Sequence, residues 1–270
     1  MIGIVYSKLD EAGKNMAEYL VKTYDFEEAG GSPNLKYQNG IARIYEVDVF
    51  SYQAEFVDSF NCDTIVFLSR HKSEAGIAAL TTHSLGNWRK EAAFGGKPSE
   101  LSFAAPIPML LTLENLNKIG IDADKTYEAT HHGPLLKTPS YFVELGGNEE
   151  VVVNKKFATL VAEASYKTLV SLKEGESAHS KVVVGIGSNH YPSKFSKLAL
   201  EKGYAFSHIL PKHAILNEDG TSNLAVLEQA LTRSTPEPEA AVVDWKSLNS
   251  LMKEETLKKL EEMGLDYEKV

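Results

Sequence analysis

Apolar, β-branched runs alternate with amphipathic helical patterns along the chain. The run IGIVY (residues 2–6) predicts a first strand. In the segment 10–24 that follows, Ala12, Met16 and Leu20 recur at intervals of four residues, as they do on one face of a helix. The chain therefore opens with a strand and an amphipathic helix.

The same pattern continues to the end of the chain. An Asn-Gly pair lies between two extended runs, so residues 36–47 are expected to form a hairpin, and the nearly continuous apolar run DTIVFLSR (63–70) is typical of a buried strand. Further strands are predicted at residues 140–145, 181–187, 205–210 and 240–245, and further helices at 108–120, 154–172, 193–203 (capped by Ser193) and 222–234, with two short helices at the end.

Strands that alternate with helices indicate an α/β fold. We predict a three-layer architecture, with a mixed, mostly parallel sheet and helices on both of its faces. No internal repeat or low-complexity tract is found, so residues 1–270 are expected to form a single α/β domain, or two lobes without a recognisable boundary. In such sheets, functional residues gather where strands end and loops begin.

Composition excludes several classes of protein. Hydrophobic residues make up 43% of the chain and charged residues 24%, which is an ordinary globular balance. The sequence has neither a long apolar run nor a basic N-terminal leader, so we expect no membrane span, no signal peptide and a cytoplasmic location. Cys62 is the only cysteine, so any metal is expected to be bound by His, Asp or Glu.

The net charge of −9 argues against a protein that coats a long nucleic acid, because such proteins are normally basic. Basic residues do form local clusters, which leaves room for a confined contact with RNA. These clusters are Arg70-His71-Lys72, Arg89-Lys90, Lys155-Lys156, and Lys194 with Lys197.

Polar residues that are suited to chemistry follow the predicted strands in four places. They are LSRHKSEAGIAALTTHSLGNW (68–88), TYEATHHGPLLKTPSYFVELGG (126–147), GIGSNHYPSKFS (185–196) and HILPKHA (208–214). The glycines of GIG do not form a dinucleotide fingerprint, because the third glycine and the later acid are missing. They are expected to form a tight turn between strand and helix, whose N–H groups could bind a phosphate or a carboxylate.

The adjacent pair His131-His132 is the strongest sign of a reactive centre. Neighbours on a strand point to opposite faces, so the two rings can share a ligand only if the chain turns, as Gly133-Pro134 allows. Zinc accepts imidazole nitrogens and carboxylate oxygens, so this pair with Glu144 and either His83 or His190 would suffice. A hydrogen-bonded pair that only orients a loop is the alternative, as is a histidine that acts as a general base without metal.

The segments SRHKSEAGIAALTTHSLGNW, EATHHGP, FVELGG and GIGSNHYPSKFS, in this order, resemble the archaeal-type D-aminoacyl-tRNA deacylases, a family also found in plants. The resemblance covers nearly the whole chain. It implies a zinc-dependent hydrolase that cleaves the ester between a D-amino acid and the terminal ribose of tRNA. It also implies a fold similar to that of phosphorylases and peptidyl-tRNA hydrolases. Ser188-Asn189 departs from a more glycine-rich form of this loop, which affects loop detail only.

With this resemblance, the residues can be assigned expected roles. The expected catalytic residues are His83, His131, His132 and Glu144, and the expected zinc ligands are His131, His132, His190 and Glu144. The expected contacts with the 3′ acceptor end of D-aminoacyl-tRNA are Arg70, His71, Lys72 and Lys194 for phosphates, Trp88 for the terminal adenine, and Gly185 and Gly187 for close backbone approach. Trp88 could equally be a core aromatic residue. The protein is expected to act as a monomer, without a membrane.

Other functions remain open at this point. A peptidyl-tRNA hydrolase or a zinc aminopeptidase could use the same architecture, and so could a nucleoside phosphorylase. A non-catalytic module that binds RNA 3′ ends is a further alternative. The crowded His/Glu loops argue against it, because pure binders rely on Lys, Arg and aromatic residues.

Overall fold

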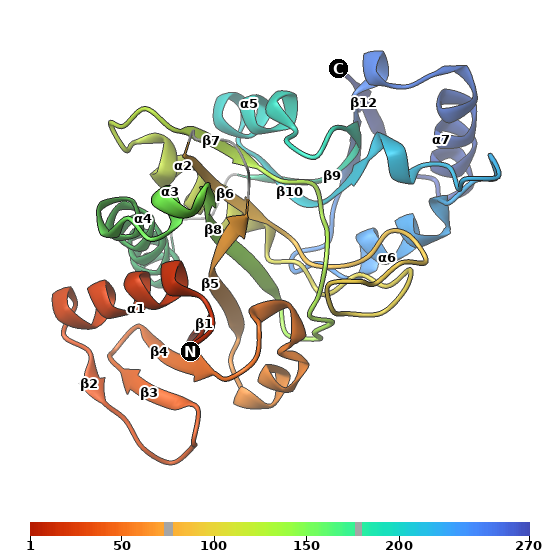
Figure 1. The fold of residues 1–270 in the computed structure, drawn as a ribbon. Helices are drawn as coiled ribbons and strands as arrows, with labels where there is room; N and C mark the ends of the chain where they lie inside the picture. The colour runs from red at the N-terminus through yellow and green to blue at the C-terminus, as the bar shows by residue number, and fades with distance from the viewer. Residues whose placement is uncertain (73–77, 176–179) are drawn as a thin grey trace.

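The fold contains two β-sheets. The structure, a computed structural model, describes residues 1–72, 78–175 and 180–270 (Figure 1). The larger sheet has the strand order β2-β3-β4-β1-β5-β8-β6-β7, and the smaller has the order β10-β9-β11-β12. The strands are β1 (Ile2–Ser7), β2 (Glu27–Glu28), β3 (Leu35–Gln38), β4 (Ala42–Val47), β5 (Thr64–Lys72), β6 (Ala79–His83), β7 (Asp124–Tyr127), β8 (Ser140–Gly147), β9 (Lys181–Ser188), β10 (Tyr204–Pro211), β11 (Ala240–Val243) and β12 (Tyr267–Lys269).

Most strand pairs are parallel, as predicted. In the larger sheet β4, β1, β5 and β8 run parallel, whereas β6 runs antiparallel to β8, and β2, β3 and β4 form antiparallel pairs. The neighbouring strands of the smaller sheet are all parallel. The predicted α/β fold with a mixed, mostly parallel sheet is confirmed, and the predicted hairpin is the β3–β4 pair.

Seven α-helices are found among the described residues, and each predicted long helix has a counterpart. They are α1 (Glu11–Thr23), α2 (Pro106–Asn117), α3 (Glu149–Val152), α4 (Lys155–Glu174), α5 (Ser193–Lys202), α6 (Leu227–Thr232) and α7 (Ser250–Glu262). Asp10 caps α1 by accepting hydrogen bonds from the N–H groups of Ala12 and Gly13, and the predicted face of α1 is buried. The predicted cap of α5 is wrong, because Pro192 precedes that helix and no side chain caps it.

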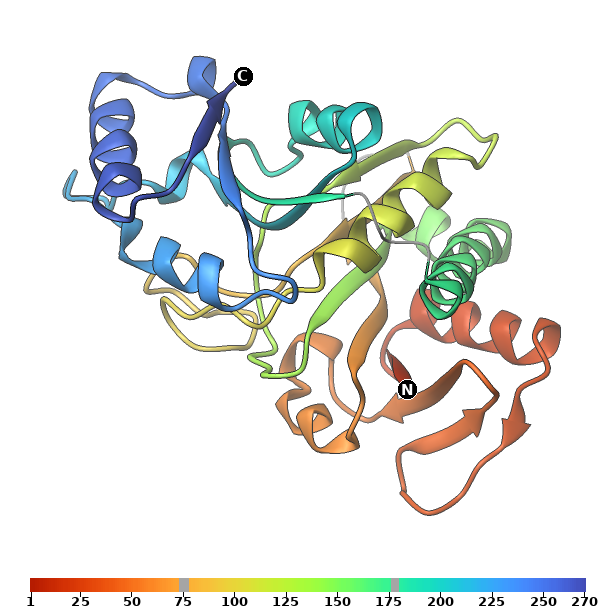
Figure 2. The same cartoon turned by 180° about the vertical axis from the view of Figure 1, so that it is seen from behind.

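The helices cover the sheets unequally. Helices α1, α2 and α4 pack against the face of the larger sheet that carries Ile4, Val66 and Val143, and Figure 2 shows α2 lying between the two sheets. The opposite face, with Phe67 and Phe142, packs against the short 3₁₀ helices η1 (Ser51–Gln53) and η2 (Glu55–Phe60) and against loops. The prediction of helices on both faces therefore needs this correction for the larger sheet.

The smaller sheet has α-helices on both faces. Alternate residues of β9 point in opposite directions, so Val183 packs toward α2 and α5, whereas Val184 packs toward α6 and α7. The end of the chain differs from the prediction, because only α7 is an α-helix there and β12 follows it as an edge strand. None of the helices in the described part of the chain is long and apolar enough to span a membrane.

Candidate functional site

The candidate site lies on the face of the larger sheet that α-helices leave open. Side chains alternate along a strand, so Phe67, Ser69 and His71 of β5 share one face. In the sheet register Ser69 pairs with Glu144 of β8, and Glu144 pairs with Thr81 of β6. His71, His83 and Glu144, which come from three adjacent strands, therefore point toward one another.

The loop between β7 and β8 supplies the remaining groups. The N–H of Glu128 donates to the carbonyl of Thr82, and the N–H of Ala129 donates to the carbonyl of His190, which ties this loop to β6 and to the loop after β9. His132 has a φ of 46°, in the left-handed region, so the chain turns between the two adjacent histidines. The turn expected at this position is present.

The rings of four predicted histidines lie together. The centroid of the His131 ring is 4.1 Å from that of His83, 4.4 Å from that of His132 and 4.7 Å from that of His190. The His83 ring also stacks on Phe142, with centroids 5.2 Å apart and planes at 8°. Three segments of the chain, the end of β6, the loop after β7 and the loop after β9, thus meet at one point.

Two buried carboxylates face these rings. An oxygen of Glu144 lies 3.6 Å from Nε2 of His83 and 3.5 Å from Nδ1 of His71. Glu128, whose side chain is fully buried, has an oxygen 2.8 Å from Nε2 of His190, 3.2 Å from Nδ1 of His71 and 3.7 Å from Nε2 of His131. The sequence reasoning missed Glu128. The only available sign was its position three residues before His131.

Backbone contacts fix the orientation of three imidazoles. The Nδ1 atoms of His83, His131 and His132 lie 3.0, 2.8 and 2.7 Å from the carbonyl oxygens of Ser84, Ala129 and Gly133. A ring that donates its Nδ1 proton to a carbonyl keeps an unprotonated Nε2 with a free lone pair when it is neutral. Such rings can act as bases or as metal ligands.

Several buried polar atoms of the site make no contact with hydrogen-bond geometry within the described residues, although histidine nitrogens and carboxylate oxygens lie close to one another. They are Nε2 of His83, both oxygens of Glu128 and one oxygen of Glu144. Unsatisfied buried groups are costly, and a bound cation is one way to satisfy several at once. Three sets of these side chains have ligand atoms close enough to hold a metal ion: His71, Glu128, His131 and His190; His83, His131 and His132; and His83, Glu128 and Glu144.

The predicted ligand set is only partly reproduced by these groups. It combined His131, His132 and His190 with Glu144. In the structure His131 and His190 lie against Glu128, whereas Glu144 lies between His71 and His83. The described residues thus contain clusters that could hold a metal ion.

The carboxylates and the rings shift one another's pKa values. Burial lowers the pKa of His71, but contacts with Glu128 and Glu144 outweigh burial and raise it to about 10. Burial raises the pKa values of Glu128 and Glu144, yet contacts with the histidines outweigh it and hold both below their usual range. Burial and the neighbouring His83 lower the pKa of His132 to about 4.

Burial, followed by the neighbouring rings of His83 and His132, also lowers the pKa of His131 well below its usual range. At neutral pH both adjacent histidines are therefore neutral, with Nε2 able to accept a proton or bind a metal.

The cluster forms part of the wall of a cavity of about 410 Å³. The cavity is lined by His71, His131, His132 and Glu144 of the cluster, by Asp10, Ser69, Arg70 and Phe142, and by Phe50, Ser51, Tyr52 and Phe94. A smaller cavity of about 210 Å³, with Arg89 and His213 in its wall, lies on the far side of His131 and His132. The histidines thus border open space on two sides.

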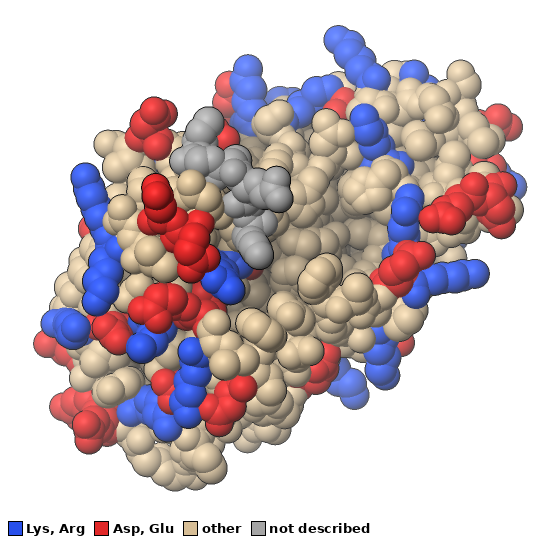
Figure 3. Space-filling view, viewed as in Figure 1, with Lys and Arg blue, Asp and Glu red and all other residues tan. Residues whose placement is uncertain are grey.

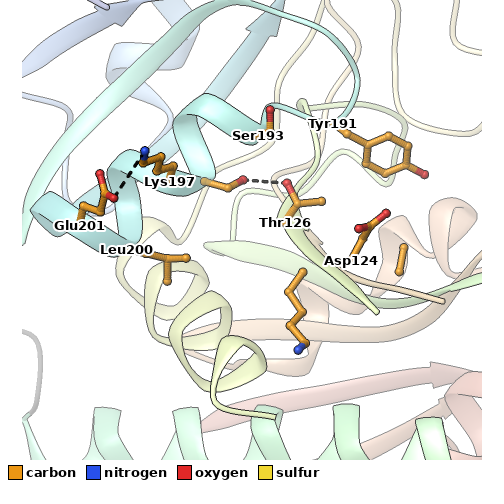
Figure 4. Close-up of a pocket in the computed structure, with 10 residues that line it drawn as sticks. Asp124, Thr126, Tyr191, Ser193, Lys197, Leu200 and Glu201 are labelled. Carbon is orange, nitrogen blue, oxygen red and sulfur yellow. Dashed lines mark hydrogen bonds and ion pairs between the residues drawn. The ribbon is translucent and has the colours of Figure 1, made fainter. Parts of the chain in front are cut away.

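A third cavity, of about 620 Å³, lies between β7 and α5 (Figure 4). Thr126 approaches α5 there, with its Oγ1 2.8 Å from Oγ of Ser196, and Lys197 pairs with Glu201 on the same helix. Tyr191 connects this cavity with the cluster, because its ring centroid lies 4.9 Å from that of His190. The reactive groups themselves do not line it.

The residues predicted to bind substrate lie in different parts of the structure. Arg70 lines the 410 Å³ cavity, is 32% exposed and approaches Glu149 at 3.7 Å. His71 belongs to the cluster itself and does not lie in a separate basic loop. The side chain of Lys72 lies outside the described residues. Trp88 is 4% exposed and packs in the core beside the smaller sheet, and it also borders the 210 Å³ cavity.

Three further residues that were predicted to bind substrate make contacts within the protein. A Cβ on Gly185 would lie 2.9 Å from the ring of Phe195, and one on Gly187 would lie 2.6 Å from Leu248, so both glycines make room for core packing. Lys194 forms an ion pair with Asp244. Among the described residues, none of these three lines the cavities beside the histidines.

Comparisons with known proteins agree with the resemblance in the sequence. A family model described as D-aminoacyl-tRNA deacylase matches residues 58–268. A D-aminoacyl-tRNA deacylase of Pyrococcus furiosus is 36% identical over 98% of both chains, and one of Methanocaldococcus jannaschii is 30% identical over 99% of this chain and 98% of its own. A crystal structure of a conserved protein of unknown function superposes with a TM-score of 0.88 at 29% identity, covering 100% of this chain and 95% of that chain. The predicted family and the predicted class of enzyme, a hydrolase, are thereby confirmed: the chain belongs to the D-aminoacyl-tRNA deacylase family.

Proposed function

We propose that the histidine–carboxylate cluster hydrolyses the ester between a D-amino acid and the 3′-terminal ribose of tRNA, which releases free tRNA and the D-amino acid. One observation carries the proposal: imidazoles and carboxylates from three adjacent strands and two loops converge beside a cavity that Arg70 also lines. Peptidyl-tRNA hydrolysis and peptide hydrolysis remain alternatives for the same chemistry.

Contact with tRNA is proposed to be confined to its acceptor end. The net charge is −9, and in Figure 3 Lys and Arg are interspersed with Asp and Glu around a hollowed, uncharged centre. A protein that gripped a long stretch of backbone would need a broad basic surface. Arg70 lines the cavity, which supports it as the proposed contact for a phosphate close to the ester.

The donor atoms of the cluster suit zinc, and this is our proposal for the cofactor. Zinc prefers four ligands drawn from imidazole nitrogens and carboxylate oxygens. The set of His71, Glu128, His131 and His190 provides three imidazoles and one carboxylate. When bound there, the ion would supply an acidified water and polarisation of the ester carbonyl.

Glu144 is proposed to be the general base. It lines the cavity, its depressed pKa keeps it ionised at neutral pH, and Nε2 of His83 lies 3.6 Å from its carboxylate. Glu144 takes a proton from the attacking water as the water oxygen bonds to the ester carbon. The bond from that carbon to the ribosyl oxygen then breaks, and the oxygen receives the same proton. Glu144 thus gives up the proton that it took, and it is ionised again at the end of each turnover.

The test measures deacylation of D-Tyr-tRNA together with zinc content. Glu144→Gln is expected to lower kcat by roughly 100-fold or more, as the loss of a general base does, and to retain zinc. Glu163→Gln, at a carboxylate on α4 that pairs with Lys167, serves as the control for a carboxylate away from the site. L-Tyr-tRNA and N-acetylated peptidyl-tRNA are tested in parallel. Turnover of these two alone, or wild-type kcat in Glu144→Gln, would overturn the proposal.

A further inference from the structure

We propose that Phe50, Tyr52 and Phe94 form a platform on which the terminal adenine of the tRNA stacks while the ester lies against the histidine cluster. This inference rests on the proposed function, because it names how that substrate is held. The three rings and the cluster line the same cavity of about 410 Å³.

The rings form a row that leads to the cluster. Phe50 and Tyr52 stack with centroids 5.4 Å apart and planes at 7°, and Tyr52 meets Phe94 edge-on at 5.7 Å. The ring of Tyr52 lies 6.1 Å from that of His132. A base stacked on this row would therefore have its ribose directed toward the adjacent histidines.

The outer rings of the row are exposed to solvent. Phe94 is 60% exposed, the largest value for a large apolar side chain among the described residues, and Phe50 is 38% exposed. Exposed aromatic faces at the mouth of a cavity are unfavourable in water and are suited to cover by a flat, apolar surface. A nucleobase provides such a surface.

Backbone packing holds the platform against the histidine loop. The N–H of Gly133 donates to the carbonyl of Phe94 at 2.9 Å. A Cβ added at Gly95 would lie 1.7 Å from the carbonyl oxygen of Tyr52, so the backbone segments that carry the rings are in direct contact. The backbone segments that carry the rings are thus held next to the histidine loop, as stacking before cleavage requires.

Polar groups at the same cavity suit the rest of a nucleotide. Ser51 is 4% exposed, lines the cavity, and its hydroxyl has no hydrogen-bond partner among the described residues. That hydroxyl is available to the base or the ribose. Arg70, which lines the same cavity, is available to the terminal phosphate.

The adenine fits this platform better than the D side chain does. The adenine is common to every substrate, and stacking on aromatic rings is a strong and general way to bind a base. The side chain varies among substrates, and a row of aromatic rings would favour aromatic D-amino acids over small or acidic ones. The sequence reasoning sought the stacking ring at Trp88, which is buried. The aromatic density of VFSYQAEF (49–56) was the signal that it missed.

The experiment compares Phe94→Ala with Phe56→Ala. Phe56 is 43% exposed, lies on η2 and packs edge-on against Phe60, so it is a matched phenylalanine outside the cavity. The assays are steady-state deacylation of D-Tyr-tRNA and D-Asp-tRNA, and competitive inhibition by AMP. Thermal unfolding of each variant checks that the fold is intact.

Phe94→Ala is expected to raise KM and the AMP inhibition constant by roughly 5- to 150-fold, the range for loss of one stacking contact. The increase in KM should be the same for both substrates. Phe94→Trp should restore both constants, and Phe56→Ala should match the wild type. A KM increase confined to D-Tyr-tRNA would assign the rings to the side chain, and unchanged constants would remove them from binding; either result overturns the platform. A wild-type enzyme inactive on both substrates would instead refute the proposed function.

Discussion

Metal binding by this cluster should compete with a proton on His71. Contacts with Glu128 and Glu144 raise the pKa of His71 to about 10 in the metal-free protein, so at pH 7 only about one ring in a thousand is neutral. His71 belongs to the four-residue donor set, and a ligand nitrogen must give up its proton before it binds a metal. Removing that proton at pH 7 costs about 4 kcal/mol. The apparent affinity for zinc should therefore increase about tenfold per pH unit between pH 7 and pH 9.

The assay is competition with a chromophoric chelator at three pH values, corrected for the chelator's own titration. Calorimetry in two buffers of different ionisation enthalpy counts the protons released, and we expect about one per ion from His71. His71→Ala should bind zinc more weakly and lose this pH slope, whereas His213→Ala, outside the donor sets, should keep it. A flat pH profile in the wild type, or an equal slope in His71→Ala, would refute the reasoning.

Three further predictions concern stability and binding. The raised pKa of His71 stabilises the metal-free fold fully below pH 6.5, and this contribution is lost as pH rises through about 10. The melting temperature of chelator-treated protein should therefore fall over that interval, whereas that of the zinc-loaded protein should change less. Met16→Ala removes a fully buried side chain from α1 and should lower the free energy of unfolding by about 2–5 kcal/mol in urea titrations, with exposed Lys22→Ala near zero. Asp10→Ala removes the acceptor for the N–H groups of Ala12, Gly13 and Arg70, so it should lower the free energy of unfolding by about 1–3 kcal/mol and raise KM. An unchanged KM would separate Arg70 from substrate binding.

The sequence was sufficient to predict elements in which apolar residues recur at regular intervals. It was insufficient to predict short strands that consist mainly of polar residues. Helix α1 was predicted because Ala12, Met16 and Leu20 mark its buried face. Strand β6, which reads Ala-Leu-Thr-Thr-His, was not predicted, because Thr81 and His83 face the site and Thr82 on the opposite face is also polar, so polar and apolar residues do not alternate. The split into two sheets also depends on long-range pairing, which local patterns do not contain.

Site residues could be predicted where they form an unusual pattern in the sequence. They could not be predicted where only the fold brings an ordinary residue into the site. The adjacent pair His131-His132 was conspicuous in the sequence, whereas Glu128 was one acid among many until β7 placed it inside the cluster. Lys194 appeared suited to phosphate because the sequence does not reveal its partner Asp244. A cytoplasmic location and a monomeric state stay predictions, as does the extent of a single domain.

The register of β6 makes the centre sensitive to the length of this strand. His83 pairs with Phe142 at the last position of β6 and reaches the cluster only because its side chain points to the same face as Glu144. Inserting or deleting one residue within Ala79–His83 would shift the register and turn the imidazole to the opposite face. Natural relatives and engineered variants alike should therefore keep this five-residue strand free of length changes, while surface turns elsewhere on the molecule can lengthen or shorten.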